Sequence, residues 1–135
     1  MSPPRKQAAR CPAARAKVWL ELEGEYVFGL GIADILRAVG ATGSIKAAAR
    51  ETGKSYRHVW SRIKAVEGRL GVRLVATQVG GGDARRSELT ESARVLIEEF
   101  DRLRGRVFEL VEREFGERLE AVLERVFARE RLPDA

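Results

Sequence analysis

The side chains with the clearest chemical potential lie close together between positions 55 and 64. Hydroxyl, arginine and lysine side chains recur there on one side of a predicted helix, opposite the apolar Val59 and Ile63. An arginine can form two hydrogen bonds with a guanine edge, and hydroxyl groups can donate to bases or phosphates. The set therefore predicts a surface that contacts DNA, made by Ser55, Tyr56, Arg57, Trp60, Ser61 and Lys64.

A solvated polar face on an ordinary helix is the alternative interpretation of these residues. For Arg57 we favour contact with DNA, because its guanidinium can bond a guanine edge or clamp a phosphate. For Trp60 the pattern leaves packing on the domain and contact with DNA equally open, since a fully exposed indole is unfavourable.

Two short helices around a tight turn must position these side chains. Ser44 is expected to cap a helix over residues 45–52, and Ser55 is expected to cap the next helix, which runs to about Leu70. The unpaired amides at the start of the first helix, together with Ser44 and Lys46, predict a phosphate site. This pattern is typical of a helix-turn-helix, whose second helix enters the DNA major groove.

Strands and a further helix are expected around the helix-turn-helix. Residues 17–31 alternate between apolar and polar types and predict a β-hairpin, and residues 32–39 predict a short helix ended by the glycines that follow. Residues 74–89 predict a second hairpin, a wing, around a run of three glycines. Arg85 and Arg86 on this wing are expected to reach a minor groove or its flanking phosphates, with plain solvation as the alternative.

A long C-terminal helix is expected over residues 91–131, either continuous or broken near Gly105 or Gly116. About 40 helical residues would extend ~60 Å, which is more than one small domain can bury. The surplus apolar stripe then needs a partner, and a second copy of the chain gives a two-fold homodimer. The residues expected to mediate dimerisation are Leu96, Phe100, Leu103, Val107 and Leu110.

Charge is distributed unevenly along the 135 residues. Residues 1–90 hold 16 Lys and Arg against 8 Asp and Glu, whereas residues 91–135 hold 9 against 12, which gives the net charge of +5. The basic part contains the helix-turn-helix, as phosphate neutralisation requires. No apolar run approaches the ~20 residues of a membrane helix, and residues 1–16 predict a disordered basic tail rather than a secretory signal, so we expect a cytoplasmic protein without membrane contact.

No catalytic, metal or cofactor site is predicted. His58 is the only histidine, Cys11 is the only cysteine, and no acidic cluster lies at metal-ligand spacing. The glycine run at 80–82 is not followed by Lys-Ser or Lys-Thr, so a nucleotide-binding loop is not supported. We therefore expect neither enzymatic activity nor a cofactor.

Two sets of positions carry a family resemblance. The first is Ala48-Ala49, Ser55, Ile63, Val66, Glu67, Leu70, Gly71 and Leu74. The second is Val18-Trp19-Leu20, Gly43-Ser44-Ile45, Ser55-Tyr56, Trp60 and Leu89-Thr90. The first set resembles the helix-turn-helix of LysR-type regulators, and the second resembles the molybdate-responsive regulators of the ModE family, over about residues 17–110.

The resemblance implies a mainly α fold with a small β component. It is a winged helix-turn-helix with an N-terminal β-hairpin and a long C-terminal dimerisation helix, organised as residues 1–16, 17–90 and 91–131. ModE regulators also carry molybdate-binding domains, and LysR-type regulators carry an effector domain. Because only helix follows the wing here, we expect a stand-alone DNA-binding module and do not expect molybdate as a ligand.

The sequence thus predicts a sequence-specific transcriptional regulator that binds double-stranded DNA as a homodimer. Two alternatives stay open. One is a winged-helix module that binds another protein. The other is a ligand-responsive regulator with a pocket at the C-terminal helices, where an aromatic group could accept an effector of unknown identity; that group is Phe100, Phe108 and Phe115.

Overall fold

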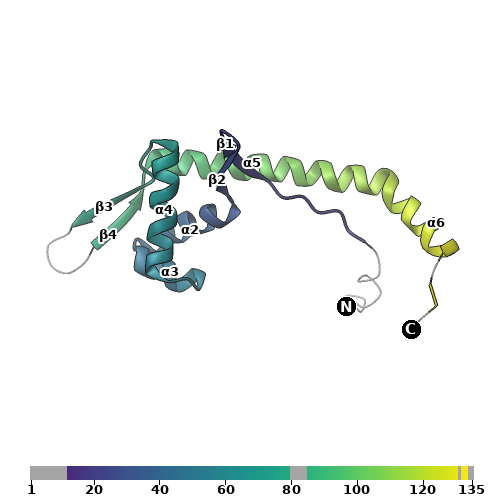
Figure 1. Cartoon of the computed structure of the whole chain (residues 1–135), viewed down its shortest axis with the longest axis horizontal. Helices are drawn as coiled ribbons and strands as arrows, with labels where there is room; N and C mark the ends of the chain where they lie inside the picture. Colours follow the sequence, from purple (N-terminus) through teal and green to yellow (C-terminus); the bar gives the residue numbers. More distant parts are fainter. Residues whose placement is uncertain (1–11, 80–84, 131, 134–135) are drawn as a thin grey trace. The chain divides into compact units, whose positions relative to one another are not determined.

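The computed structural model describes residues 12–79, 85–130 and 132–133 (Figure 1). The chain divides into a compact unit over residues 18–102 and a second unit that combines the residues before it with the helix from residue 103 onwards. The elements in chain order are β1 (Trp19–Leu22), β2 (Glu25–Gly29), α2 (Leu30–Thr42), α3 (Ile45–Thr52), α4 (Tyr56–Leu70), β3 (Val75–Val79), β4 (Arg85–Leu89), α5 (Glu91–Glu114), a π-helical turn (Phe115–Leu119) and α6 (Glu120–Glu130).

The predicted fold class is confirmed, because helices dominate and the strands form two separate antiparallel hairpins. In the first hairpin Leu22 pairs with Glu25, and both loop residues between them have positive φ, 54° at Glu23 and 81° at Gly24. Such a two-residue loop matches the natural twist of the flanking strands. In the second hairpin β3 pairs with β4 from Val75 opposite Leu89 to the turn, and the predicted glycine turn lies outside the described residues.

Helices α3 and α4 have the predicted bounds, because strong local signals define both ends of each. The Ser44 hydroxyl oxygen accepts a hydrogen bond from the Ala47 amide at 3.1 Å, and the Ser55 hydroxyl oxygen accepts one from the His58 amide at 3.1 Å. Each bond satisfies an amide that has no partner within its helix. A glycine in the left-handed conformation follows each helix and ends it.

The prediction for α2 was too short, because the helix spans Leu30–Thr42 rather than residues 32–39. Gly40 lies inside the helix and does not end it. A Cβ atom at Gly40 would lie only 2.8 Å from Cδ1 of Leu89 on β4, so the missing side chain allows α2 and the wing to approach closely. The helix ends instead at Gly43, which has φ of 74°.

The core of the 18–102 unit gathers side chains from β2, from α2 to α4 and from the first turns of α5. The rings of Phe28 and Phe100 meet edge to face with their centroids 5.1 Å apart. Phe100 is only 3% exposed and Leu96 packs against the same core, so both stabilise their own domain. Of the predicted dimerisation residues, Leu103 and Leu110 remain exposed.

A salt bridge adds a polar link between α2 and α5 inside the same unit. The guanidinium of Arg37 donates to both carboxylate oxygens of Asp101, with an Nη2–Oδ1 distance of 2.8 Å, and its Nε atom lies 3.5 Å from Asp34. This two-pronged geometry orients both helices more firmly than a single contact would.

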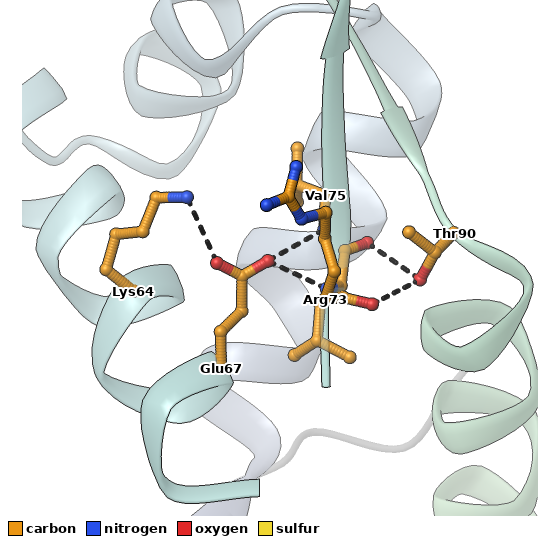
Figure 2. A network of polar contacts seen from close by, with 6 residues as sticks. Lys64, Glu67, Arg73, Val75 and Thr90 are labelled. Carbon is orange, nitrogen blue, oxygen red and sulfur yellow. Dashed lines mark hydrogen bonds and ion pairs between the residues drawn. The ribbon is translucent and has the colours of Figure 1, made fainter. Parts of the chain in front are cut away.

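Glu67, in the last turns of α4, ties this helix to the base of the wing (Figure 2). One oxygen of its carboxylate accepts hydrogen bonds from the amides of Leu74 at 2.7 Å and Val75 at 3.2 Å. Its other oxygen lies 3.2 Å from the ammonium of Lys64. On the far side of the same segment, the Thr90 hydroxyl donates to the carbonyl oxygen of Arg73.

These contacts determine the ionisation of Glu67, whose side chain is only 11% exposed. Burial alone would raise the pKa of its carboxyl group, but the two amide hydrogen bonds and the nearby Lys64 ammonium together outweigh burial and hold the pKa below its ordinary value. The carboxylate is therefore the form that the native structure stabilises.

The C-terminal helix is continuous through Gly105 and changes character near Gly116. Phe115–Leu119 forms a π-helical turn in which the Glu120 amide donates to the carbonyl oxygen of Phe115, five residues back. Regular α-helix lies on both sides of this turn. Among the described residues, no helix is long and apolar enough to cross a membrane.

We predict that Glu67→Gln lowers the free energy of unfolding by about 1–3 kcal/mol near neutral pH, because two amides lose a charged acceptor. A lowered native pKa gives stability that is complete above the unfolded-chain pKa of about 4.3 and is lost as the pH falls through the native pKa. The difference between wild type and variant should therefore shrink below about pH 4 in urea unfolding. Glu51→Gln, at an exposed position, is the control and should change stability little at any pH; a Glu67→Gln difference that is constant with pH would contradict the assignment.

We also predict that Phe100→Ala lowers the free energy of unfolding by about 3–5 kcal/mol, as expected for a large buried ring. Val95→Ala, on the same helix but half exposed, should change it by no more than about 0.5 kcal/mol. Denaturant unfolding of both variants measures the difference. Similar small effects at the two positions would show that Phe100 is not part of the domain core.

Candidate nucleic-acid interface

Helix α4 presents two chemically different sides. Val59, Ile63 and Val66 are buried in the domain core. The other side exposes Tyr56 and Trp60, at 47% and 45%, between cationic and hydroxyl side chains. The predicted recognition residues on this exposed side are Ser55, Tyr56, Arg57, Trp60, Ser61 and Lys64.

The exposed side chains differ in how strongly they are held. None of the ion pairs found among the described residues includes Arg57, so its guanidinium can still bind an acceptor. Lys64 is held by Glu67, and its ammonium lies 5.9 Å from the centre of the Trp60 ring. This cation–π contact restrains the indole while leaving nearly half of it accessible.

Arg62 and Arg69 are directed elsewhere. The Arg62 guanidinium lies 5.7 Å from the centre of the Tyr26 ring, and the Arg69 guanidinium pairs with Glu25. Both contacts hold α4 against β2. Their charges therefore contribute mainly to the attachment of the helix and not to its exposed side.

The start of α3 lies next to the exposed side of α4. Ser44 caps α3, and its first amides have no acceptor within the helix, as at any helix N-terminus. Lys46 is exposed in the first turn, where the helix dipole also favours an anion.

An open hollow of about 430 Å³ brings three elements of the 18–102 unit together. The starts of α3 and α4 and the two strands of the wing contribute to it. Its lining residues are Ser44, Ile45, Lys46, Tyr56, Trp60, Thr77 and Ser87. The hollow therefore combines hydroxyl groups, one ammonium, helix amides and two aromatic rings, which is a set suited to a phosphodiester and its adjoining bases.

Two of these residues, Thr77 and Ser87, were not predicted from the sequence. They are directly opposite each other in the β3–β4 pairing, and Ser87 is only 3% exposed. The sequence gives no signal for this, because the burial of Ser87 follows from the pairing of β3 with β4. The Ser87 amide also donates to the carbonyl oxygen of Gly43 at 2.8 Å, which ties the wing to the turn before α3.

The wing places Arg86 in β4 with its side chain exposed, paired with Gln78 across the hairpin. Arg85 is the first residue of β4, and its side chain lies outside the described part of the structure. The segment from residue 43 to residue 89 holds 10 Lys and Arg against 4 Asp and Glu. This excess of positive charge favours a polyanionic partner.

The described residues also bear on a metal site and on a pocket at the C-terminal helix. Within the described ranges, no group of three or more His, Cys, Asp or Glu side chains lies close enough to hold a metal ion. The hollow that Phe108 lines with Val111 has a volume of only about 80 Å³, whereas an open hollow beside Val107 and Leu110 has a volume of about 370 Å³. Pockets that bind small molecules usually have volumes of at least about 300 Å³.

The helix-turn-helix and wing are similar to parts of known proteins. Residues 33–94 match the family described as bacterial regulatory helix-turn-helix proteins of the lysR family. The chain is also similar to the molybdenum-pterin-binding protein MopB of Rhodobacter capsulatus, with 35% identity over 77 residues, which are 57% of this chain and 28% of MopB. The chain thus spans less than a third of that relative, and the similarity supports the ModE-like resemblance.

Solved structures give similar matches. The CbnR_DBD–DNA complex is 27% identical, with 69% of this chain and 95% of that chain covered and a TM-score of 0.47. ArgP from Mycobacterium tuberculosis is 26% identical, with 64% of this chain and 29% of that chain covered and a TM-score of 0.42. Residues 33–94 are thus similar to the helix-turn-helix domain of the lysR family of bacterial regulatory proteins.

Proposed function

We propose that this protein is a sequence-specific DNA-binding transcriptional regulator that acts as a homodimer. Helix α4 enters the major groove, and the wing formed by β3 and β4 lies over the adjacent backbone. The observation that carries the proposal is the exposed side of α4, where Arg57, Tyr56 and Trp60 stand beside the hollow at the start of α3. The family match over residues 33–94 supports it.

The proposed interface residues fall into two groups: those that position the domain on the duplex and those that contact base edges. Ser44, Lys46 and the first amides of α3 bind a phosphate, which sets the depth and orientation of the domain on the duplex. Arg57, Ser61 and Tyr56 then reach base edges, since they extend from the first two turns of α4. The Ser55 hydroxyl oxygen accepts a hydrogen bond from the His58 amide as a helix cap. Its hydroxyl hydrogen is still available to donate a hydrogen bond to a phosphate.

Trp60 supplies an apolar surface at the centre of this interface. The ring is held by Lys64 and borders the hollow, so it can cover a thymine methyl group or a sugar without a large loss of side-chain entropy. In this proposal the indole, which is 45% exposed, packs partly on its own domain and offers its open side to DNA.

Arg57→Ala should weaken binding to the preferred duplex by about 1–3 kcal/mol and relax the sequence preference, because a bidentate base contact is lost. Arg129→Ala removes the same charge from α6 and is the matched control. Fluorescence anisotropy at fixed, near-physiological salt measures both. If the two variants bind equally well, Arg57 is not a reading residue.

Arg86→Ala should weaken binding to specific and unrelated duplexes by similar factors. Its contact is assigned to the backbone, so the slope of log affinity against log salt should become shallower by about 1. A change confined to the preferred sequence would instead place Arg86 on a base edge.

Absence of salt-dependent binding to any duplex in the parent protein would favour the alternative of a protein-interaction module.

A further inference from the structure

The hydroxyl group of Ser87 is a buried donor that the domain itself does not use. The residue is only 3% exposed, and its amide is bonded to the Gly43 carbonyl. Among the described residues its hydroxyl makes no hydrogen bond, and no fully enclosed side-chain oxygen lacks a partner, so the Ser87 oxygen must still reach the surface. A buried hydroxyl without a partner lowers stability. A ligand therefore explains this residue better than folding does.

The pairing of the wing strands determines which hollow this hydroxyl faces. Ser87 lies directly opposite Thr77, so the two side chains are on the same side of the hairpin. Thr77 lines the hollow at the starts of α3 and α4 but not the neighbouring hollow of about 400 Å³, which residues 86–89 line in succession. Because alternate side chains of a strand point to opposite faces, such a run contributes its backbone edge. The Ser87 hydroxyl therefore faces the hollow that also contains Ser44 and Lys46.

The groups around this hydroxyl are also hydrogen-bond donors. The Ser44 oxygen accepts a bond from the Ala47 amide, which leaves its hydroxyl hydrogen available. The amides of Ile45 and Lys46 come first in α3 and have no acceptor within the helix. The Lys46 ammonium belongs to none of the ion pairs found among the described residues. Of the described residues that line the hollow, none is acidic. This set of donors is suited to an anion.

We infer that this end of the hollow is a pocket for one free tetrahedral oxyanion, such as inorganic phosphate or sulfate, and that the bound ion competes with DNA. The inference rests on the proposed function, because the ion takes the place of the DNA phosphate at the start of α3. It adds that the wing closes the pocket through the Ser87 hydroxyl. The donors then come from two elements, α3 and β4, and surround the ion without help from a nucleotide.

Competition follows from the shared donors. Amide and hydroxyl hydrogens that bind a free ion cannot bind a DNA phosphate at the same time. Dissolved salt also weakens DNA binding by screening and by counterion effects, but these effects act on the whole basic surface. They do not depend on one buried hydroxyl. The specific part of the effect is therefore the part that Ser87→Ala removes.

Amide chemical shifts of the full chain test the pocket directly. Sodium phosphate, exchanged for sodium chloride at constant ionic strength, should shift the amide resonances of Ile45, Lys46 and Ser87 in a saturable way. Ser87→Ala should bind phosphate about tenfold to a hundredfold more weakly, since a hydrogen bond to a charged group is lost. Ser92→Ala removes an exposed hydroxyl from α5 and is the matched control, which should bind as the parent does. Shifts that do not saturate, or equal affinity in Ser87→Ala, would overturn the inference.

Urea unfolding separates ligand binding from a structural role of the hydroxyl. In chloride, Ser87→Ala removes a buried hydroxyl that has no partner, so its unfolding midpoint should equal or exceed that of the parent. In phosphate the parent should gain more stability than the variant, because the ion stabilises the native state that binds it. A clearly lower midpoint for Ser87→Ala in chloride would show that the hydroxyl supports the fold, and would overturn the inference.

Competition is measured by fluorescence anisotropy with one labelled duplex. Exchanging chloride for phosphate at constant ionic strength should weaken DNA binding by the parent more than by Ser87→Ala. Equal sensitivity of the two proteins would overturn the competition.

The same measurements distinguish this inference from the proposed function. Salt-dependent DNA binding without a saturable phosphate site would leave the regulator proposal standing and remove the pocket. Saturable phosphate binding that depends on Ser87, in a protein that binds no duplex, would support the pocket and contradict the proposed regulator.

Discussion

The carboxylate of Glu67 sets the relation between the two parts of the candidate interface. Glu67 belongs to α4, yet one oxygen of its carboxylate accepts hydrogen bonds from the amides of Leu74 and Val75, where the wing begins. Because this group is charged and largely buried, it stabilises one arrangement of the backbone and penalises others. The exposed side of α4 and the strand that carries Thr77 are thereby held at a fixed separation, and the hollow between them keeps its shape.

A second tether acts on the other strand of the wing. The Ser87 amide is bonded to the Gly43 carbonyl, and Gly40 lets Leu89 approach α2. The start of α3, which is the candidate phosphate site, is therefore fixed to the same hairpin that Glu67 fixes to α4. An interface that places a phosphate site and a base-reading helix on one rigid frame loses little entropy on binding. Under the proposed function, this rigid frame favours the recognition of particular sequences.

Local signals explain which parts of this arrangement could be predicted from the sequence. The caps at Ser44 and Ser55 depend on residues three positions away, so the bounds of α3 and α4 followed directly. The end of α2 was misjudged because the role of Gly40 depends on Leu89, which is distant in sequence. Ser87 and its hollow were missed for the same reason, since only the pairing of β3 with β4 brings it to the helices. The exposed side of α4 was predictable because one helical periodicity defines it.

The most direct test of the central claim is selection of bound duplexes from a random pool with the purified full chain at near-physiological salt. A two-fold dimer with one reading helix in each copy predicts enrichment of an inverted repeat whose half-sites are about one helical turn apart or a multiple of it. Arg57→Ala should lose that enrichment at particular base positions while retaining weak binding. A folded, dimeric protein that enriches no sequence would contradict the account of α4 as a reading helix.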